Sequence, residues 1–208
     1  MEKFTVLKAI AAPLMLPNID TDRMVRIERC AGVSPEEVGR YLFESMRFLA
    51  DGSENPAFVL NRAPFREAKI LLAAENFGCG SSRENAVWAL KSWGLRCVIA
   101  PSFGDIFFGN CFQNGMLPIR IPAAQVEMLA AAIEVDQGNA LLGVDLDRQQ
   151  ISTAKGELLA FEVEPLRRKM LLEGLDEIGL TLQHEAEIAA FQQRDRAMRP
   201  WIYPPTRP

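Results

Sequence analysis

The chain has 208 residues, of which 49% are hydrophobic and 24% are charged, and its formal net charge is −4 at pH 7. This length suffices for one sizeable domain with a buried core, and the mild negative charge argues against nucleic-acid binding as the main function. The longest apolar runs are short and contain proline, and no secretory signal pattern is present, so we expect a cytoplasmic protein without membrane spans.

Predicted strands and helices alternate along the chain, which is the pattern of a layered α/β protein. Glycine follows two of the helices and proline begins another, as expected at helix ends and starts. The predicted elements are, in chain order, an extended run at 4–11, an Asx-type turn at 17–22, a capped helix at 34–49, a polar turn and short extended piece at 51–61, a strand at 69–74, a helix ending at Trp93, a strand at 96–100, a helix from Ser102 to Asn114, a strand at 117–121, a helix at 123–135, a β-hairpin at 143–163 turned at 154–156, a helix from Pro165 and a final helix at 180–198. We expect a single domain over residues 1–195 and a C-terminal tail at 196–208.

The segment NFGCGSSRENAVWAL, residues 76–90, is the most informative part of the sequence. It follows a predicted strand, turns through two glycines and opens a helix, with Ser81, Ser82 and Arg83 in the expected first turn. Free backbone N–H groups and the positive end of the helix dipole favour an anion at such a place. The arginine adds a planar fork that suits a carboxylate. The pattern therefore predicts a pocket for a small polycarboxylic acid.

A capping role explains part of the same pattern without any ligand. Ser81 and Glu84 have the spacing of a capping box, and the glycines suit a tight turn. A cap formed by Ser81 would still leave Ser82 and Arg83 available to an anion, so the two interpretations are compatible. The segment has neither the Gly-Lys-Ser/Thr ending of a phosphate loop nor the Gly-x-Gly-x-x-Gly spacing of a dinucleotide site, and a nucleotide is not favoured.

The four cysteines and the single histidine do not form a ligand pattern. Cys30, Cys79, Cys97 and Cys111 include no Cys-x-x-Cys pair, so we expect free, mostly buried thiols and no metal site in this chain. His184 lies in a helical pattern far from the glycine turn, which gives little support to a catalytic role.

Three segments together resemble a known family. NFGCGSSRENAVWAL is similar to the signature of the small subunit of 3-isopropylmalate dehydratase, within the aconitase superfamily. LPNIDTDRMVR at 16–26 and SFGDIFFGNCFQNGMLPI at 102–119 resemble two further segments of that subunit, in the same order. The likeness extends over about residues 1–195.

This resemblance implies the swivelling β/β/α fold and one half of a hydro-lyase. The family enzyme isomerises 2-isopropylmalate and 3-isopropylmalate by dehydration and rehydration in leucine biosynthesis. The resemblance also implies a heterodimer with a large subunit that carries a [4Fe–4S] cluster. This chain is then expected to hold no cofactor itself, to be inactive alone and to act on a small hydroxy-dicarboxylic acid.

The resemblance carries residue roles over to the glycine-turn segment. Ser81 matches the family's catalytic serine base, and Ser82 and Arg83 match residues that bind the substrate carboxylate. A serine hydroxyl is a very weak acid, so its alkoxide would need the stabilisation that a helix N-terminus and nearby cations provide.

The segment near the N-terminus supplies further candidates. Asp22 matches an aspartate that approaches the catalytic pocket in aconitase-like sites, although its role in an Asx turn is an equally good interpretation. Arg26 and Arg29 are candidates to bind the variable end of the substrate, against the usual tendency of loop arginines to face solvent.

Two departures from the family pattern leave alternatives open. The family usually has histidine where this chain has Asn85, which keeps hydrogen bonding but does not titrate near neutral pH. The stretch from residue 27 to 48 also differs from the glycine-rich, aromatic pattern of many bacterial small subunits. A paralogous dehydratase subunit acting on citramalate, a dimethylmalate or homoaconitate, or a diverged binding subunit without turnover, therefore remains open.

Overall fold

A computed structural model describes residues 1–80 and 83–203 of the chain. Its described part contains one curled seven-stranded sheet in the order β4-β3-β2-β1-β5-β6-β7. The strands are β1 Val6–Leu14, β2 Ile70–Ala73, β3 Cys97–Ala100, β4 Leu117–Arg120, β5 Leu141–Asp145, β6 Gln150–Thr153 and β7 Leu158–Ala160. The mixed α/β architecture predicted from the sequence is confirmed.

The sheet has a parallel and an antiparallel half that meet at β1. Strand β1 pairs in parallel with β2 and antiparallel with β5. Strands β2 and β3 are apolar at every position and buried on both faces, as parallel strands covered by helices are. The α-helices are α1 Thr21–Met24, α2 Glu44–Arg47, α3 Glu84–Trp93, α4 Asp105–Gln113, α5 Ala123–Val135, α6 Pro165–Glu173, α7 Glu177–Leu182 and α8 Glu185–Met198.

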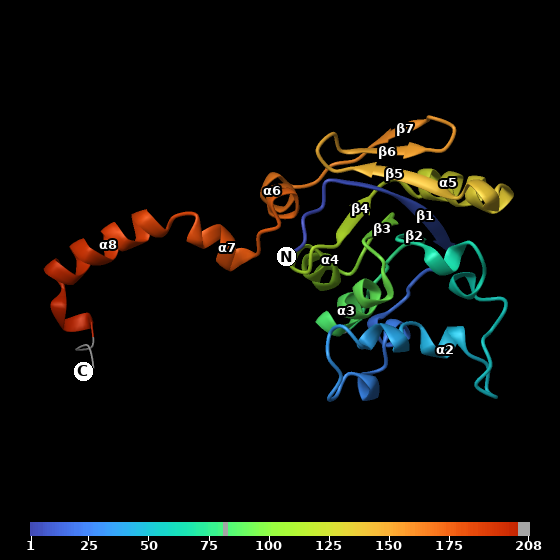
Figure 1. Ribbon diagram of the computed structural model, residues 1–208, viewed down its shortest axis with the longest axis horizontal. Helices are drawn as coiled ribbons and strands as arrows, with labels where there is room; N and C mark the ends of the chain where they lie inside the picture. Colours follow the sequence, from blue (N-terminus) through green and yellow to red (C-terminus); the bar gives the residue numbers. More distant parts are fainter. Residues whose placement is uncertain (81–82, 204–208) are drawn as a thin grey trace.

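The helices α3 and α4 connect the parallel strands β2, β3 and β4, and α5 leads from β4 to β5. Helices α3 and α4 pack against each other below the parallel strands, and α5 packs on β1, β2 and β3 (Figure 1). The predicted strand at 69–74 and the helix at 123–135 are confirmed within one residue at each end. Short 3-10 turns connect the remaining segments, at Ile27–Arg29, Val38–Tyr41, Val59–Asn61, Phe65–Glu67, Gln137–Asn139 and Pro200–Ile202.

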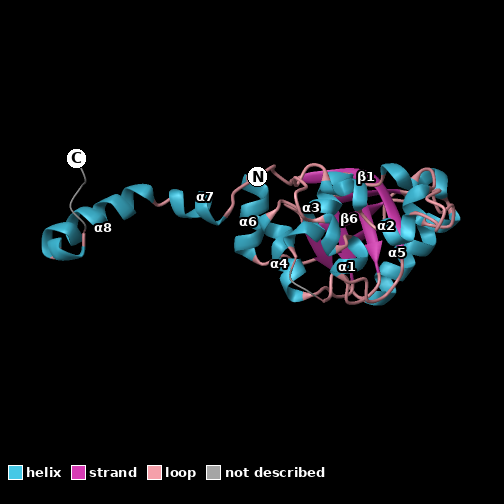
Figure 2. Cartoon of the chain, turned by 90° about the horizontal axis from the view of Figure 1, so that it is seen from below, coloured by secondary structure: helices cyan, strands magenta, loops and turns pink. Residues whose placement is uncertain are grey.

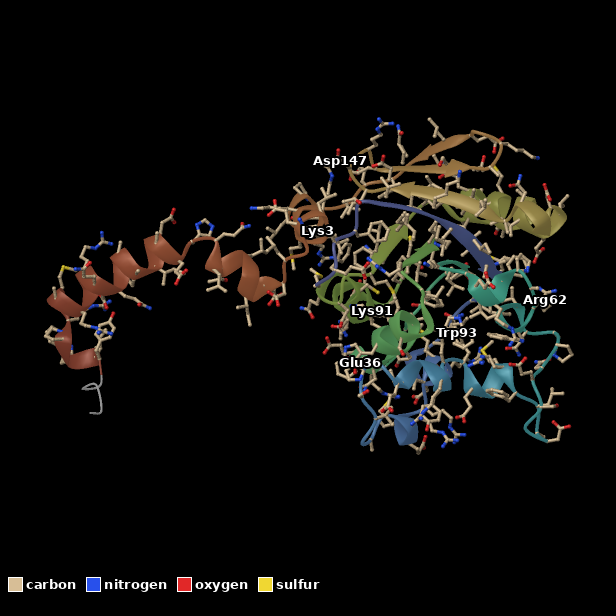
Figure 3. The ribbon with its side chains drawn as sticks, viewed as in Figure 1. Lys3, Glu36, Arg62, Lys91, Trp93 and Asp147 are labelled. Carbon is tan, nitrogen blue, oxygen red and sulfur yellow. The ribbon has the colours of Figure 1, made fainter. Side chains whose placement is uncertain are left out.

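The helix predicted at 34–49 is wrong. The structure has a 3-10 turn at Val38–Tyr41 and then the one-turn helix α2, separated by Phe43 in a left-handed conformation (φ 52°). Phe43 is fully buried, and its N–H donates to the carbonyl of Met24. Arg47 is also buried, and its guanidinium lies 4.1 Å from the centroid of the Trp93 ring. Trp93 is labelled in Figure 3. Burial of these side chains outweighs the helical propensity of the segment.

The hairpin predicted at 143–163 is also incomplete. Its turn at 154–156 joins β6 and β7 as expected, but a second turn at 146–149 joins β5 and β6 and makes a three-stranded meander.

The predicted helix at 102–114 begins later, at Asp105, because the Ser102 hydroxyl accepts a hydrogen bond from the Asn76 N–H instead of capping a helix. The single helix predicted at 180–198 consists of two helices, α7 and α8.

The C-terminal part leaves the body of the molecule. Helix α6 packs beside the N-terminus, where the Phe4 N–H donates to the Leu171 carbonyl over 2.9 Å. Helices α7 and α8 then project away from the sheet (Figures 1 and 2). None of the helices in the described residues has the length and apolar run that a membrane span needs. Division of the chain at residue 195 stays a prediction, and α8 continues across that point to Met198.

A glycine exchange at the turn after β2 tests the packing of this region. A Cβ at Gly78 would lie 2.2 Å from the Phe107 side chain, and a Cβ at Gly52 would meet open space. Both glycines have positive φ, so alanine costs about 1–2 kcal/mol of backbone energy at either position. We expect Gly78→Ala to lower the free energy of unfolding by roughly 1–3 kcal/mol more than Gly52→Ala, measured by urea denaturation. Equal losses in the two variants would contradict this close contact.

Candidate functional site

Three loops meet at one edge of the sheet, where β1, β2 and β3 end. Because these strands are parallel, their carboxyl ends lie side by side, which is where α/β sheets form ligand crevices. Backbone hydrogen bonds connect the loops. The Gly78 N–H donates to the Ile19 carbonyl over 2.7 Å, and the Phe77 N–H donates to the Ser102 carbonyl over 3.1 Å. The three segments that carry the sequence motifs therefore form one surface.

Two asparagines that sequence reasoning did not assign hold the first two loops together. Asn18 and Asn76 have φ values of 56° and 58°, a region that asparagine tolerates better than most residues. The Asn76 Nδ2 donates to the Asn18 Oδ1 over 2.7 Å. Their left-handed conformations turn both chains back toward the sheet edge. Asn18 lies within the predicted Asx-type turn at 17–22 and Asn76 is the first residue of the glycine-turn segment, and these positions are the sequence signal for them.

Arg83 and Asp22 form a bidentate ion pair across this surface. The Arg83 Nη1 and Nη2 donate to the two Asp22 carboxylate oxygens, each over 2.7 Å, although the residues are 61 positions apart in sequence. The Arg83 side chain is 14% exposed, and that of Asp22 is 59% exposed. A nearly buried fork thus faces a carboxylate that lies on the solvent side.

The ion pair shifts both ionisation equilibria toward the charged forms. Hydrogen bonding to Arg83 lowers the pKa of the Asp22 carboxyl, with burial opposing and the charges of Arg83 and Arg26 adding to the effect. The same hydrogen bonds raise the pKa of Arg83. Both groups are therefore fully charged near neutral pH.

The two other candidate arginines lie just beyond Asp22. Arg26 is exposed and approaches Glu28 within 3.5 Å, and its charge reaches Asp22. Arg29 donates to both carboxylate oxygens of Glu44 over 2.7 and 3.0 Å and lies over the Tyr41 ring. The structure thus brings Arg26 toward the ion pair and holds Arg29 in a separate pair.

The start of α3 differs from the prediction. Arg83, expected in the first turn, is the residue directly before the helix and makes no capping hydrogen bond through its side chain. Glu84, expected in a capping box, accepts from the Asn114 Nδ2 over 2.8 Å. Trp88 and Lys91, the latter labelled in Figure 3, also donate to Asn114. Asn114 therefore fixes α3 against the end of α4, and the predicted roles of Ser81 and Ser82 lie outside the described residues.

The remaining candidates take no part in the ion pair. Asn85 is half-buried on the first turn of α3. Cys97 and Cys111 are fully buried, and burial raises the pKa of both thiols. His184 lies at the start of α8 and faces Glu187. Within residues 1–80 and 83–203, no group of three or more His, Cys, Asp and Glu side chains is arranged to hold a metal ion.

The fold and this site define a class of protein. It is an α/β module in which a nearly buried arginine fork binds a carboxylate beside the ends of the parallel strands, an arrangement suited to anionic ligands. Residues 1–124 match the sequence model of the family described as the aconitase C-terminal domain. Residues 177–204 match a second model, described as the C-terminal domain of the 3-isopropylmalate dehydratase small subunit.

Curated relatives and a solved structure narrow the class. The 3-isopropylmalate dehydratase small subunit of Gluconacetobacter diazotrophicus is 53% identical, with 97% of each chain covered. That of Paramagnetospirillum magneticum is 51% identical over 97% of this chain and all of its own. A crystal structure of 3-isopropylmalate dehydratase from Methanocaldococcus jannaschii is similar at a TM-score of 0.66 and 25% identity, covering 89% of this chain and 99% of that one. The chain belongs to the 3-isopropylmalate dehydratase small-subunit family.

The ion pair can be tested by titration. Since the folded-state pKa of Asp22 is lowered, its stabilisation is present above the unfolded value of about 3.9 and is lost as the pH falls through the lowered pKa. We expect the Asp22 carboxyl to titrate below its ordinary range in wild-type protein, measured by carboxyl-detected NMR. In Arg83→Gln it should titrate closer to the ordinary value. An ordinary pKa in the wild-type chain would contradict the pair in solution.

Proposed function

We propose that this chain provides the carboxylate-binding half of the active site of 3-isopropylmalate dehydratase. As the small subunit of this hydro-lyase, it takes part in the isomerisation of 2-isopropylmalate and 3-isopropylmalate in leucine biosynthesis. The observation that carries the assignment of the site is the bidentate pair between Arg83 and a carboxylate at the sheet edge.

The Asp22 carboxylate is a chemical stand-in for a substrate carboxylate. It has the two oxygens, the charge and the planar geometry that an arginine fork binds best. Because Arg83 is nearly buried and Asp22 is more than half exposed, Asp22 can leave while the fork stays in place. A substrate carboxylate that replaces Asp22 would then inherit the hydrogen bonds of Arg83 and lie beside the released aspartate.

The catalytic roles of Ser81 and Ser82, which lie outside the described residues, are assigned by their match to the family pattern. Ser81, two residues before Arg83, takes the proton from the carbon next to the bound carboxylate, and Ser82 adds a second contact to that carboxylate. The charge of Arg83 and the start of α3 stabilise the serine alkoxide. Asp22, held ionised by its lowered pKa, is a second group able to accept a proton beside the substrate. Arg26 is available to the variable end of the substrate, and Arg29 would first have to leave Glu44.

The dehydration chemistry also requires a partner. The curated relatives are named as small subunits, which implies a large-subunit partner. We propose that this large subunit carries a [4Fe–4S] cluster. Two of the four thiols of this chain are fully buried in β3 and α4, and the others are half-buried in separate loops, so the cysteines do not suit cluster ligation. When bound on the partner, such a cluster supplies a Lewis acid for the substrate hydroxyl. A cytoplasmic location fits an enzyme of amino-acid biosynthesis.

The test of the carboxylate clamp is Arg83→Lys in the complex reconstituted anaerobically with the large subunit. Lysine keeps the charge and loses the fork. We expect kcat/KM for 3-isopropylmalate to fall about 10- to 100-fold, which corresponds to the roughly 1.5–3 kcal/mol of a charged hydrogen bond. Arg66→Lys is the matched control, because Arg66 also binds a carboxylate bidentately, that of Glu54, away from the site. Equal activity of the two variants would refute the clamp.

The role of Ser81 has its own kinetic signature. Removal of a catalytic base affects the chemical step more than substrate binding. We expect Ser81→Ala to lower kcat by about 100-fold or more with little change in KM, measured in the same reconstituted assay. Ser34→Ala, at a half-buried serine in another loop, controls for a general loss of hydroxyl groups. An unchanged kcat in Ser81→Ala would rule out the base.

A further inference from the structure

The C-terminal arm, defined here as residues 177–203, consists of α7, α8 and the turn at Pro200–Ile202. It extends away from the sheet (Figures 1 and 2). The side chains of α8 project into open space on several sides (Figure 3). The arm is tied to the body at its base, where Glu177 accepts from Gln113 and Gln183 bonds to Lys169 and Glu173 of α6. Among the described residues, every hydrogen bond and ion pair formed by residues 185–203 stays within the arm.

Several large apolar side chains of the arm are exposed to water, which is energetically unfavourable. Trp201 is 77% exposed, and Met198 and Ile202 beside it are more than half exposed. Clusters of exposed apolar side chains mark interaction surfaces, and tryptophan is among the residues most enriched at binding hot spots. The large apolar side chains exposed along the arm are Ile178, Leu182, Phe191, Met198, Trp201 and Ile202.

The end of the arm is held in its conformation by contacts within the arm itself. Asp195 is buried although it lies on a projecting helix, because Arg199 and Tyr203 close over it. The Tyr203 hydroxyl donates to the Asp195 Oδ2 over 2.7 Å, and the Arg199 guanidinium donates to Oδ1. Arg196 lies over the Tyr203 ring. This hook turns the chain back on α8 and fixes Trp201 on its outside. A surface that is ordered before binding loses less entropy on association.

Two observations identify the partner as the large subunit. The body of the chain matches a module named as the C-terminal domain of aconitase, so in that protein the module is covalently joined to the preceding domains. A separate chain lacks this link and the high effective concentration that it provides, so interface contacts must replace it. The arm lies outside the aconitase match and has a model of its own, described as the C-terminal domain of the 3-isopropylmalate dehydratase small subunit. The arm is thus an addition found where the module is a separate chain and is not covalently joined to the other domains.

We propose that the C-terminal arm is the docking element for the large subunit, with Trp201, Met198 and Ile202 as its anchor. The hook formed by Asp195, Arg199 and Tyr203 holds this anchor in its binding conformation. This inference rests on the proposed pairing with a large subunit, and it assigns the arm to association and not to substrate binding. Within the described residues, the arm contributes no group to the Arg83 site.

The test compares full-length variants of this chain with the purified large subunit of the same enzyme. The anchor variant carries Trp201→Ser, Met198→Ser and Ile202→Ser. The matched control carries Val135→Ser, Leu158→Ser and Val6→Ser, three similarly exposed apolar residues of the body. Circular dichroism checks that both remain folded. Association is measured by analytical ultracentrifugation and by titration calorimetry.

We expect the anchor variant to raise the Kd for the large subunit at least tenfold, with the control unchanged. At saturating concentrations of large subunit, kcat should return to the wild-type value, since the arm is remote from the reacting groups. Asp195→Asn, which keeps the shape of the hook and removes its charge, should raise the Kd by a smaller factor. An unchanged Kd in the anchor variant, or a kcat that stays low at saturation, would overturn the proposal.

Two further outcomes separate this inference from the proposed function and from self-association. If wild-type chain fails to bind the large subunit at all, the proposed function fails with it. If Arg83→Lys binds normally and lacks turnover, and the anchor variant binds as tightly as the wild type, only the role of the arm is wrong. If the anchor substitutions abolish a homodimer of this chain and leave the Kd for the large subunit unchanged, the arm binds a second copy and the proposal is overturned.

Discussion

The site depends on a close approach between backbones that leaves no room for side chains. A Cβ at Gly104 would lie 2.4 Å from the Gly78 carbonyl oxygen, and a Cβ at Gly78 would overlap the Phe107 ring. Only with glycine at both positions can the loops after β2 and β3 cross and be joined by the Gly104 N–H bond to the Phe77 carbonyl. This crossing fixes the loop after β2 as far as Gly80, and the guanidinium of Arg83 is held beside it by Asp22 of the loop after β1.

The pair between Arg83 and Asp22 has consequences for the binding of the proposed carboxylate substrate. A buried guanidinium without a partner would be costly, so Asp22 keeps the fork in place in the absence of substrate. Replacing one carboxylate by another leaves the number of charged hydrogen bonds to Arg83 unchanged, and the exchange is therefore close to neutral at this residue. Net affinity must then come from the other substrate groups. A ligand with a single carboxylate gains little from this site, which favours substrates with at least two.

The sequence allowed most of the local elements to be predicted, but not the contacts between distant segments. Regular periodicity located α5 and the buried strands, because their burial is continuous and their ends carry turn residues. The break at Phe43 was missed because tertiary burial, and not local propensity, decides the backbone there. The Asx-turn interpretation of Asp22 could not anticipate a partner 61 residues away. The hydrogen bond that Glu84 accepts from Asn114, which is also distant in the sequence, could not be anticipated either, and the Ser81 half of the predicted capping box lies outside the described residues.

When half of an active site lies on a separate chain, the interface between the chains must position the reacting groups. A single-chain enzyme does not have this requirement. In the proposed assembly, the carboxylate of the substrate and the group that receives its hydroxyl are held by different subunits, so an error in docking becomes an error in the distance between reacting atoms. Misplacement by about 1 Å can cost about 100-fold in rate. The proposed docking arm is joined to α6 by side-chain hydrogen bonds of Gln183, and α6 is joined to the N-terminal segment by the backbone bond between Phe4 and Leu171. Loss of the proposed anchor therefore weakens association, while Arg83 keeps its bonds to Asp22, which come from the body.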